Sequence, residues 1–411
     1  MNTTETRPDA VPTRSILMVC VAAMISLAVA MGVGRFAFTP LFPLMVRDGL
    51  LGNETGAVLA AANYLGYLVG ALLVARVRAR AATLLALGLI GTVAVTAGVG
   101  WTASVPAWAL LRFVAGVLSA WTLVATSAWA LAWLASHGRP QLAGVVFAGV
   151  GLGIAAAGVF CVVAAGPASS AAHMWIELAL LAGLATLVPL VASRRHAASP
   201  AGPQNPAAVA SPAAPRRPPA HTRGLVVCYS LFGFGYILPA TYLPALARQL
   251  IDDPQVFGWA WPVFGAAAAI STLVAAWGLR RFDRRNVWAV CHVLMAVGVL
   301  LPSVWASLAS IVIAALLVGG TFMVITMIAM QEARARAEHD ATAILARMTS
   351  GFAFGQLLGP VASAVLGRLT ADPSTALTCA LLLAASGLVA SAIYLRHEVR
   401  QHTRHETHCH A

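Results

Sequence analysis

The chain has 411 residues, of which 60% are hydrophobic and only 10% are charged. A soluble protein of this length would carry roughly a quarter charged residues, so this composition excludes an ordinary soluble fold. The mean hydropathy is +0.82, and apolar stretches long enough to span a bilayer recur from Ser15 to Leu395. The sequence therefore predicts an all-α polytopic membrane protein.

All 26 basic residues are arginine, and the formal net charge is +12. Such an excess would suit nucleic acid, but the arginines fall between the hydrophobic stretches and not along one face. Retention of basic loops in the cytoplasm explains this distribution better. We therefore expect a lipid bilayer and a small-molecule substrate as partners, and no nucleic acid.

Twelve candidate spans follow one another along the chain, so that the short connections alternate between the two membrane faces. We expect them at residues 15–46, 54–75, 82–101, 107–135, 142–166, 173–192, 224–247, 257–279, 287–305, 308–331, 342–367 and 374–395. The polar leader 1–14 has no small-residue cleavage site after a short apolar core. The first span is therefore expected to remain as an anchor.

One connection is long. Residues 193–223 are rich in Pro, Ala and Arg, a composition typical of a flexible or partly extended cytoplasmic linker. This linker divides the spans six and six, into an N-terminal bundle at 15–192 and a C-terminal bundle at 224–395. A His-rich cytoplasmic tail follows at 396–411.

The distribution of arginine predicts the orientation. Twenty-one arginines lie in the leader, the linker, the tail and the loops on their side, whereas only Arg47, Arg248 and Arg368 lie in loops on the opposite side. Basic loops stay in the cytoplasm. We therefore expect both termini and the linker to face the cytoplasm of a bacterial inner membrane.

The two halves repeat each other. Four residues of the first span recur 201 positions later, Gly32, Gly34, Pro43 and Arg47 matching Gly233, Gly235, Pro244 and Arg248. In the fifth and eleventh spans the offset is 202 positions, Gly149 and Gly153 matching Gly351 and Gly355. A duplicated six-helix unit with parallel halves predicts a transporter whose halves rock about a site near the bilayer midplane.

An arginine lies deep in the first span. Arg35 precedes Arg47 by about twelve residues, which at 1.5 Å per residue places it about 18 Å below the outer surface. A charge at this depth must face protein or a water-filled cavity. Two roles remain open: a substrate-contacting cation whose planar fork suits a carboxylate, or an arginine that caps carbonyls freed by Pro40.

The surroundings of Arg35 carry further expectations. Pro40 and Pro43 remove backbone donors and should bend or break the outer end of the first span, where Thr39 is a candidate to re-satisfy a carbonyl or contact substrate. Gly32 and Gly34 permit close approach of a neighbouring helix.

The seventh span repeats this stretch with a tyrosine in place of the arginine. Tyr236 is expected either to line the cavity opposite Arg35 or to be an interior hydrogen-bonded tyrosine. Thr241, farther along the same span, is a further candidate to contact substrate. One charged and one aromatic side chain at equivalent positions would make the cavity asymmetric.

Two other charged residues lie within spans. Arg112 in the fourth span is expected to act in substrate binding or proton coupling, with a carbonyl clamp as the alternative. Glu177 is the acidic residue we place within a span, about one turn inside the outer face. It is a candidate for proton exchange, with an edge carboxylate in contact with water as the simpler alternative.

The remaining candidates serve packing or remain undecided. Gln356 is expected either to line the substrate path or to bond to a neighbouring helix. The packing and hinge positions that we expect are Gly32, Gly34, Pro40, Pro43, Gly149, Gly153, Gly233, Gly235, Gly351, Gly355, Gly359 and Pro360. The six cysteines are expected to be small apolar packers without disulfides. No cofactor and no metal site is expected, because the histidines of the tail fit a solvated tail better than a metal centre.

Several of these residues resemble a known family. Arg112-Phe113-Val114-Ala115-Gly116 is similar to the fourth-span motif of the major facilitator superfamily, in which the arginine is associated with proton coupling. The superfamily's acidic-and-basic loop signature is matched by Asp283-Arg284-Arg285 in the second half. In the first half Gly70 fits, but Val74 stands where the acid of a charge-paired latch between spans two and eleven belongs.

Within that superfamily one branch has a similar opening motif. Gly34-Arg35-Phe36-Ala37-Phe38-Thr39-Pro40, together with Phe232-Gly233-Phe234-Gly235-Tyr236, resembles the YbfB/YjiJ branch of bacterial inner-membrane transporters. The resemblance implies a twelve-helix fold in two pseudo-symmetric halves and transport, without implying a substrate.

The sequence therefore favours a secondary transporter that moves a small organic molecule by alternating access, driven by an ion gradient with H⁺ as the coupling ion. Two embedded arginines against one edge carboxylate favour an anionic or carboxylate substrate. Alternatives are a multidrug or metabolite exporter with a broad aromatic cavity, and a membrane receptor or scaffold that does not transport. The chain has no Walker loop to cradle nucleotide phosphates, so we do not expect ATP-driven transport. It also has no embedded His/Asp/Glu cluster of the kind that an intramembrane hydrolase needs, so we expect no enzymatic activity. We expect a monomer.

Overall fold

The structure is a computed structural model that describes residues 13–77, 79–166, 169–196, 220–250, 254–337, 341–370 and 373–409. In the first half the elements are α1 (Thr13–Leu27), η1 (Ala28–Phe36), α2 (Phe38–Arg47), α3 (Asn53–Val74), α4 (Ala81–Trp101), α5 (Val105–Ser136), η2 (Pro140–Leu142), α6 (Ala143–Ala164) and α7 (Ala171–His196). In the second half they are α8 (Ala220–Leu250), α9 (Pro254–Gly278), α10 (Arg284–Val304), α11 (Leu308–Ala335), α12 (Ala341–Leu369) and α13 (Pro373–Cys409).

Twelve helical segments of the described chain are long and apolar enough to cross a membrane. The first of them combines α1, η1 and α2 into one span, Thr13–Arg47. Each predicted span corresponds to one of the twelve, and no strand occurs in the described residues. The prediction of an all-α polytopic membrane protein with twelve transmembrane helices is confirmed.

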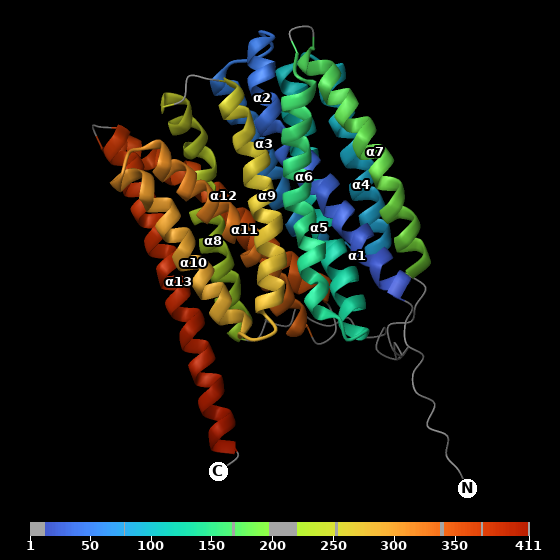
Figure 1. Cartoon of the computed structure of the whole chain (residues 1–411), viewed down its shortest axis with the longest axis vertical. Coiled ribbons are helices and arrows are strands. Elements are labelled where there is room, and N and C mark those ends of the chain that lie inside the picture. Colours follow the sequence, from blue (N-terminus) through green and yellow to red (C-terminus); the bar gives the residue numbers. More distant parts are fainter. Residues whose placement is uncertain are drawn as a thin grey trace.

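The helices form two groups that lie side by side. In Figure 1 the helices of the first half, in blue and green, stand beside those of the second half, in yellow and red. The groups meet mainly where α6 packs against α9 and where α3 packs against α12. The beginning of α1 and the end of α13 lie at the same, lower end of the view.

Glycine lets the two groups approach backbone to backbone. A Cβ added at Gly151 of α6 would overlap backbone atoms of α9 around Ala269, and one added at Gly265 of α9 would overlap α6 at Ala155. Toward the upper end, a Cβ at Gly158 would lie 2.6 Å from the Pro262 ring. Small residues therefore bring α6 and α9 together along much of their length.

The glycines of the sequence repeat lie at equivalent helix contacts in the two halves. A Cβ at Gly149 or Gly153 of α6 would overlap α1 and η1, at the carbonyls of Met24 and Ala28. A Cβ at Gly355 of α12 would in the same way overlap the Ser230 carbonyl of α8. The first span thus packs on the fifth as the seventh packs on the eleventh.

The other expected packing positions fall at similar contacts. Added Cβ atoms would lie 2.7 Å from a neighbouring side chain at Gly34, Gly235 and Gly351, and would overlap a neighbouring helix at Gly32, Gly233 and Gly359. Pro40 and Pro43 lie in α2 and Pro360 lies in α12.

The first span differs from the expected break at its outer end. Its π-helical segment η1 covers the residues around Arg35 and ends at Phe36, before the two prolines. A regular α-helix then resumes at Phe38 and continues through Pro43. The irregular backbone therefore lies at the depth of the buried arginine, and π-helical turns of this kind are frequent at functional sites.

The two polar segments of the sequence are only partly described. Most of the linker 193–223 and the last two residues of the tail lie outside the described residues. The tail was expected to be a solvated segment, but the backbone of α13 continues through it to Cys409. Side chains beyond Val399 are not described, so the expectation about the tail histidines lies outside the described part.

Candidate functional site

The two halves are joined at their centre by one hydrogen bond between buried side chains. Arg35 of η1 donates through Nη2 to Oε1 of Gln356 on α12. Arg35 is 3% exposed and Gln356 is 1% exposed. Three further donor atoms of this pair have no hydrogen-bond partner, namely Nε and Nη1 of Arg35 and Nε2 of Gln356. A buried cation with unused donors is costly unless a ligand or water satisfies them.

Aromatic rings of the first half surround the guanidinium. The Arg35 Cζ atom lies 3.9 Å from the centroid of the Tyr67 ring, and 5.6 Å from the centroids of Tyr64 and Phe36. These distances are within the range of cation–π attraction, which stabilises a guanidinium where the described residues offer no acidic partner. The arginine is therefore held by π faces on its own side of the molecule.

Rings of the second half complete the enclosure. Tyr236 of α8 stacks on Phe322 of α11, with centroids 4.5 Å apart and ring planes 11° from parallel. Phe322 in turn meets Phe36 edge to face at 6.0 Å, and Phe352 of α12 meets Tyr67 at 6.4 Å. We call these six residues, Phe36, Tyr64, Tyr67, Tyr236, Phe322 and Phe352, the aromatic cluster.

Arg112 has a different environment. Its Nη1 donates to the Gly34 carbonyl at 3.0 Å and its Nη2 donates to the Arg35 carbonyl at 2.9 Å. In a π-helix the carbonyl of residue 35 would pair with the N–H five residues later, and Pro40 has no N–H. Arg112 supplies the missing donor. These contacts match the carbonyl clamp predicted as the alternative for Arg112, and Arg112, not Arg35, caps these two carbonyls of η1.

The clamp is itself anchored to a third helix. Asn63 of α3 donates through Nδ2 to the Arg112 carbonyl at 2.9 Å. The Arg112 Cζ atom lies 4.7 Å from the Phe38 ring centroid. Both terminal nitrogens of Arg112 are therefore committed to the backbone of η1, which leaves Arg35 as the arginine with unused terminal donors at the centre.

No acidic side chain balances this centre in the described part of the chain. The ion pairs of the described residues lie at the two ends of the molecule. One joins Arg47 and Asp48, and the others join arginines and glutamates at the ends of α10, α11 and α13. Arg35 and Arg112 make none of them. The centre therefore carries uncompensated positive charge, which favours a negatively charged ligand.

The remaining predicted residues lie elsewhere. Thr39 is half-buried at the start of α2, beyond the aromatic cluster. Glu177 is exposed on α7, a helix that packs on α4 and α1, so the structure places it away from the centre. The backbone of Thr241 continues α8, but its side chain lies outside the described residues.

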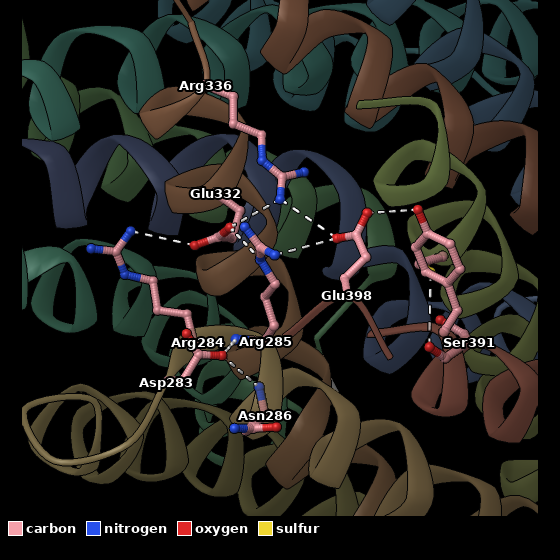
Figure 2. A network of polar contacts seen from close by, with 10 residues as sticks. Asp283, Arg284, Arg285, Asn286, Glu332, Arg336, Ser391 and Glu398 are labelled. Carbon is pink, nitrogen blue, oxygen red and sulfur yellow. Dashed lines mark hydrogen bonds and ion pairs between the residues drawn. The ribbon is translucent and has the colours of Figure 1, made fainter. Parts of the chain in front are cut away.

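The buried acids are not at the predicted position. Glu332 on α11 and Glu398 on α13 are 8% and 7% exposed, and both fall within the spans as the structure has them. Glu332 pairs with Arg284, Arg285 and Arg336, and Glu398 pairs with Arg285 and Arg336. We call these five residues the charge network, and Figure 2 shows how the two glutamates lie among the arginines.

The charge network lies at the end of the molecule where α10 begins. Asp283 caps α10 by accepting from the backbone N–H groups of Arg285 and Asn286, at 2.9 and 3.1 Å. The loop Asp283-Arg284-Arg285 could be recognised from the sequence, but its partners are 47 or more residues away. The sequence feature that could have identified these partners is a glutamate near the arginine-rich end of an apolar span.

One buried titratable side chain was not anticipated at all. His292 of α10 is fully buried and accepts at Nε2 from Trp288 Nε1, at 2.9 Å. Its ring stacks on Phe232 at 6.2 Å, and its Nδ1 has no hydrogen-bond partner. Within the described residues, no three or more His, Cys, Asp or Glu side chains are grouped so that they could hold a metal.

Twelve membrane-spanning helices in two groups, with an occluded polar pair between them, define a major facilitator superfamily transporter. A sequence model described as "Uncharacterised MFS-type transporter YbfB" matches residues 27–396. The chain belongs to this family, as the opening motif predicted. Among curated proteins, no sequence matches the chain.

A solved structure shows the same fold. The chain is similar to the human organic anion transporter MFSD10 (TETRAN), with a TM-score of 0.66 and 15% sequence identity. The match covers 95% of this chain and 100% of that one. At this level of identity the similarity establishes the fold alone.

Proposed function

We propose that the protein is a secondary transporter that carries a small organic anion across a bacterial cytoplasmic membrane by alternating access, with both termini in the cytoplasm. The observation that carries this proposal is the buried Arg35, whose unused donors lie between the two halves without an acidic partner. A guanidinium in such a site matches the charge and the geometry of a carboxylate.

The geometry also supports alternating access. Arg35 is buried beneath residues of both halves, and its hydrogen bond to Gln356 crosses from one half to the other. A substrate reaches Arg35 when the halves separate on one side, and the two halves close again around the bound substrate. The parallel repeat of six helices is the architecture that performs this movement by rocking.

The comparisons agree with an anionic substrate without establishing it. One solved structure with this fold, MFSD10, is described as an organic anion transporter. Cationic substrates would require an embedded acid, and the buried acids of the described chain, Glu332 and Glu398, are paired with arginines at one end. We therefore favour an anion over a cation.

We further propose that transport is coupled to H⁺ and that the transporter functions as a monomer. An exporter is the second candidate, because the aromatic cluster would also suit a hydrophobic metabolite moving outward. Import and export are distinguished by the direction of the imposed proton gradient that drives accumulation in vesicles.

Flux measurements in proteoliposomes test the proposal. Purified protein should catalyse saturable flux of at least one member of a panel of organic anions, and an imposed pH gradient should accelerate it. Arg35→Lys and Arg35→Ala should each abolish that flux while the protein is still produced at near wild-type level. Absence of flux for the whole panel with correctly folded protein would refute the proposal and leave a receptor or scaffold.

If the Arg35→Ala variant transports normally, the binding role of Arg35 is wrong. Arg80→Ala is the matched control, because Arg80 is exposed in the loop between α3 and α4 and is not part of the aromatic cluster. Its flux should stay within twofold of wild type.

A further inference from the structure

We propose that the substrate is a monocarboxylate with a flat aromatic body, whose carboxylate takes the place of the Gln356 oxygen on Arg35 and whose ring lies among the aromatic cluster. This inference rests on the proposed function and narrows its substrate class. It is drawn from the donors left free at the centre, the charge available there and the shape of the surrounding walls.

The first step concerns the donors. A guanidinium has two edges on which a carboxylate can bind in bidentate form, and Nη2 belongs to both of them. In the structure Nη2 is occupied by Gln356, while Nη1 and Nε, which complete the two edges, are unpartnered. Release of Gln356 therefore opens a complete bidentate edge, and the free Nε2 of Gln356 is then a donor for the same carboxylate.

The second step concerns charge. Each Nη atom of Arg112 donates to a backbone carbonyl of η1, so Arg35 is the arginine of the centre with a wholly unpartnered Nη atom. Arg112 keeps its charge but is held by the backbone, and one carboxylate on an edge of Arg35 compensates the charge of that guanidinium. A second carboxylate on the ligand would be buried among aromatic rings without a partner, at a cost of several kcal/mol. An amino acid would bury an ammonium for which the described centre offers no acid.

The third step concerns shape. Five members of the cluster, all except Tyr64, are less than 9% exposed, so a bound ligand exchanges contacts with rings and not with water. Tyr236 and Phe322 stack on each other, with centroids 4.5 Å apart and planes 11° from parallel, so the ring of a ligand replaces one of these contacts or takes an outer face, and Tyr67 lies over the guanidinium that holds the carboxylate. A flat ring stacks on such faces, whereas the hydroxyls of a sugar acid would lose water without gaining equivalent partners.

The site is shared by both halves of the molecule. Phe36, Tyr64 and Tyr67 belong to the first half, whereas Tyr236, Phe322 and Phe352 belong to the second. A ligand that holds Arg35 through its carboxylate and touches Phe352 through its ring would therefore bridge the halves. Such a ligand replaces the hydrogen bond between Arg35 and Gln356 as the central link of the occluded state.

Ligand selectivity of the full-length protein in lipid nanodiscs tests this inference. The probes are benzoate, its neutral isostere benzamide, the dianion terephthalate, the aliphatic hexanoate and the polyol gluconate. Benzoate should raise the unfolding temperature in a saturable manner. Benzamide should not, and terephthalate, hexanoate and gluconate should bind at least tenfold more weakly than benzoate.

The outcomes separate the inference from the function on which it rests. If hexanoate, gluconate or terephthalate binds as tightly as benzoate, the substrate class is wrong and the organic anion transporter remains. If benzamide binds as well as benzoate, the carboxylate role of Arg35 is wrong. If none of the five binds but another anion of the flux panel is transported, the inference alone fails, and if none binds and no anion is transported, both proposals fail.

A pair of phenylalanines on α12 gives a matched variant test. Phe352 belongs to the aromatic cluster and is 4% exposed, whereas Phe354 is two residues away and 52% exposed. Phe352→Leu should weaken benzoate binding about tenfold while it changes hexanoate binding by less than threefold. Phe354→Leu should change neither. An equal loss for both ligands in Phe352→Leu would overturn the proposed ring contact, and the wild-type selectivity series tests the inference even if that variant fails to fold.

Discussion

The two buried arginines, Arg35 and Arg112, are in direct contact but their side chains have different partners. Arg112 donates both Nη atoms to the carbonyls of Gly34 and Arg35. Arg35 donates one Nη to Gln356 and keeps Nη1 and Nε unpartnered. At the residue scale, we infer that Arg112 holds the backbone of η1 in place while Arg35 is available to a ligand.

Replacement of each arginine by methionine should separate these roles. Arg112→Met removes two hydrogen bonds from a charged donor, each worth about 1.5–3 kcal/mol, so its unfolding temperature should fall by several degrees. Arg35→Met loses transport while its unfolding temperature changes less, because one hydrogen bond and an unsatisfied charge are removed together. Thermal unfolding in detergent and flux in proteoliposomes measure the two effects. A larger loss of stability in Arg35→Met than in Arg112→Met would contradict this assignment.

At the scale of elements, the first span packs closely on the glycines of α6, and a carboxylate at its outer end contacts α7. Gly149 and Gly153 of α6 admit the backbone of α1 and η1. At the upper end, Asp48 follows α2 and accepts from the N–H of Ala171, the first residue of α7, at 2.7 Å. A carboxylate at a helix N-terminus satisfies an otherwise unpaired donor and interacts favourably with the helix dipole.

The close contact at Gly149 should not tolerate even a methyl group. Gly149→Ala would place its Cβ against the Met24 carbonyl, and overpacking of this kind costs about 1–3 kcal/mol. Gly183→Ala on α7 is the matched control, because its nearest neighbour would be Val93 at 3.5 Å, an ordinary contact. Fluorescence-detected size exclusion after heating should show loss of folded protein at a lower temperature for Gly149→Ala only. Equal tolerance of both substitutions would show that the helices separate without cost.

The contact of Asp48 with α7 should depend on pH. Burial alone would raise the pKa of Asp48, but the hydrogen bond from Ala171 and the Arg47 guanidinium outweigh burial and hold the pKa below its ordinary value. Because the folded-state pKa is lowered, the stabilisation is complete above the unfolded pKa of about 3.9 and is lost as the pH falls through the folded pKa. The unfolding temperature of the wild type should therefore drop more between pH 5 and pH 3 than that of Asp48→Asn. Parallel curves for the two proteins would exclude this contribution.

At the scale of the whole molecule, the two halves differ in whether a network of ion pairs joins their helices at the lower end. The charge network joins α10, α11 and α13 at the lower end of the second half (Figures 1 and 2). In the first half, Val74 and its neighbours supply no acid for an equivalent network. Across the halves at the same end, Gln331 of α11 donates to the Pro140 carbonyl at 3.2 Å. We infer that the second half is the more rigid of the two at this end.

Removal of Glu332 should loosen the second half. Glu332→Gln leaves Arg284, Arg285 and Arg336 together with one fewer negative charge. The expected loss lies between the about 1 kcal/mol of an exposed ion pair and the about 3 kcal/mol of a buried one, since Arg284 is partly exposed. Thermal unfolding should show a lower midpoint for Glu332→Gln and no change for Glu177→Gln, whose carboxylate is exposed on α7. Equal midpoints for both variants would mean that the network adds no stability.

Much of the fold follows from the sequence by itself. The apolar stretches determine twelve spans because a bilayer requires about twenty apolar residues per helix. The glycines at offsets of 201 and 202 positions identify the repeat because close helix packing tolerates no side chain there. Arg35 could be selected as a site residue because a charge at such depth is expensive.

Only the tertiary structure decided which partner each polar residue has. The two acceptors of Arg112 lie 78 and 77 residues away in the chain, and that of Arg35 lies 321 residues away. The depth of a charged residue in a span predicts that it needs a hydrogen-bonding partner. It does not predict which helix supplies that partner, because side chains at equal depth on several helices could reach the charge. The clamp by Arg112, the pairing of Arg35 with Gln356 and the partners of Glu332 therefore emerge from helix packing, which places distant residues within hydrogen-bonding distance.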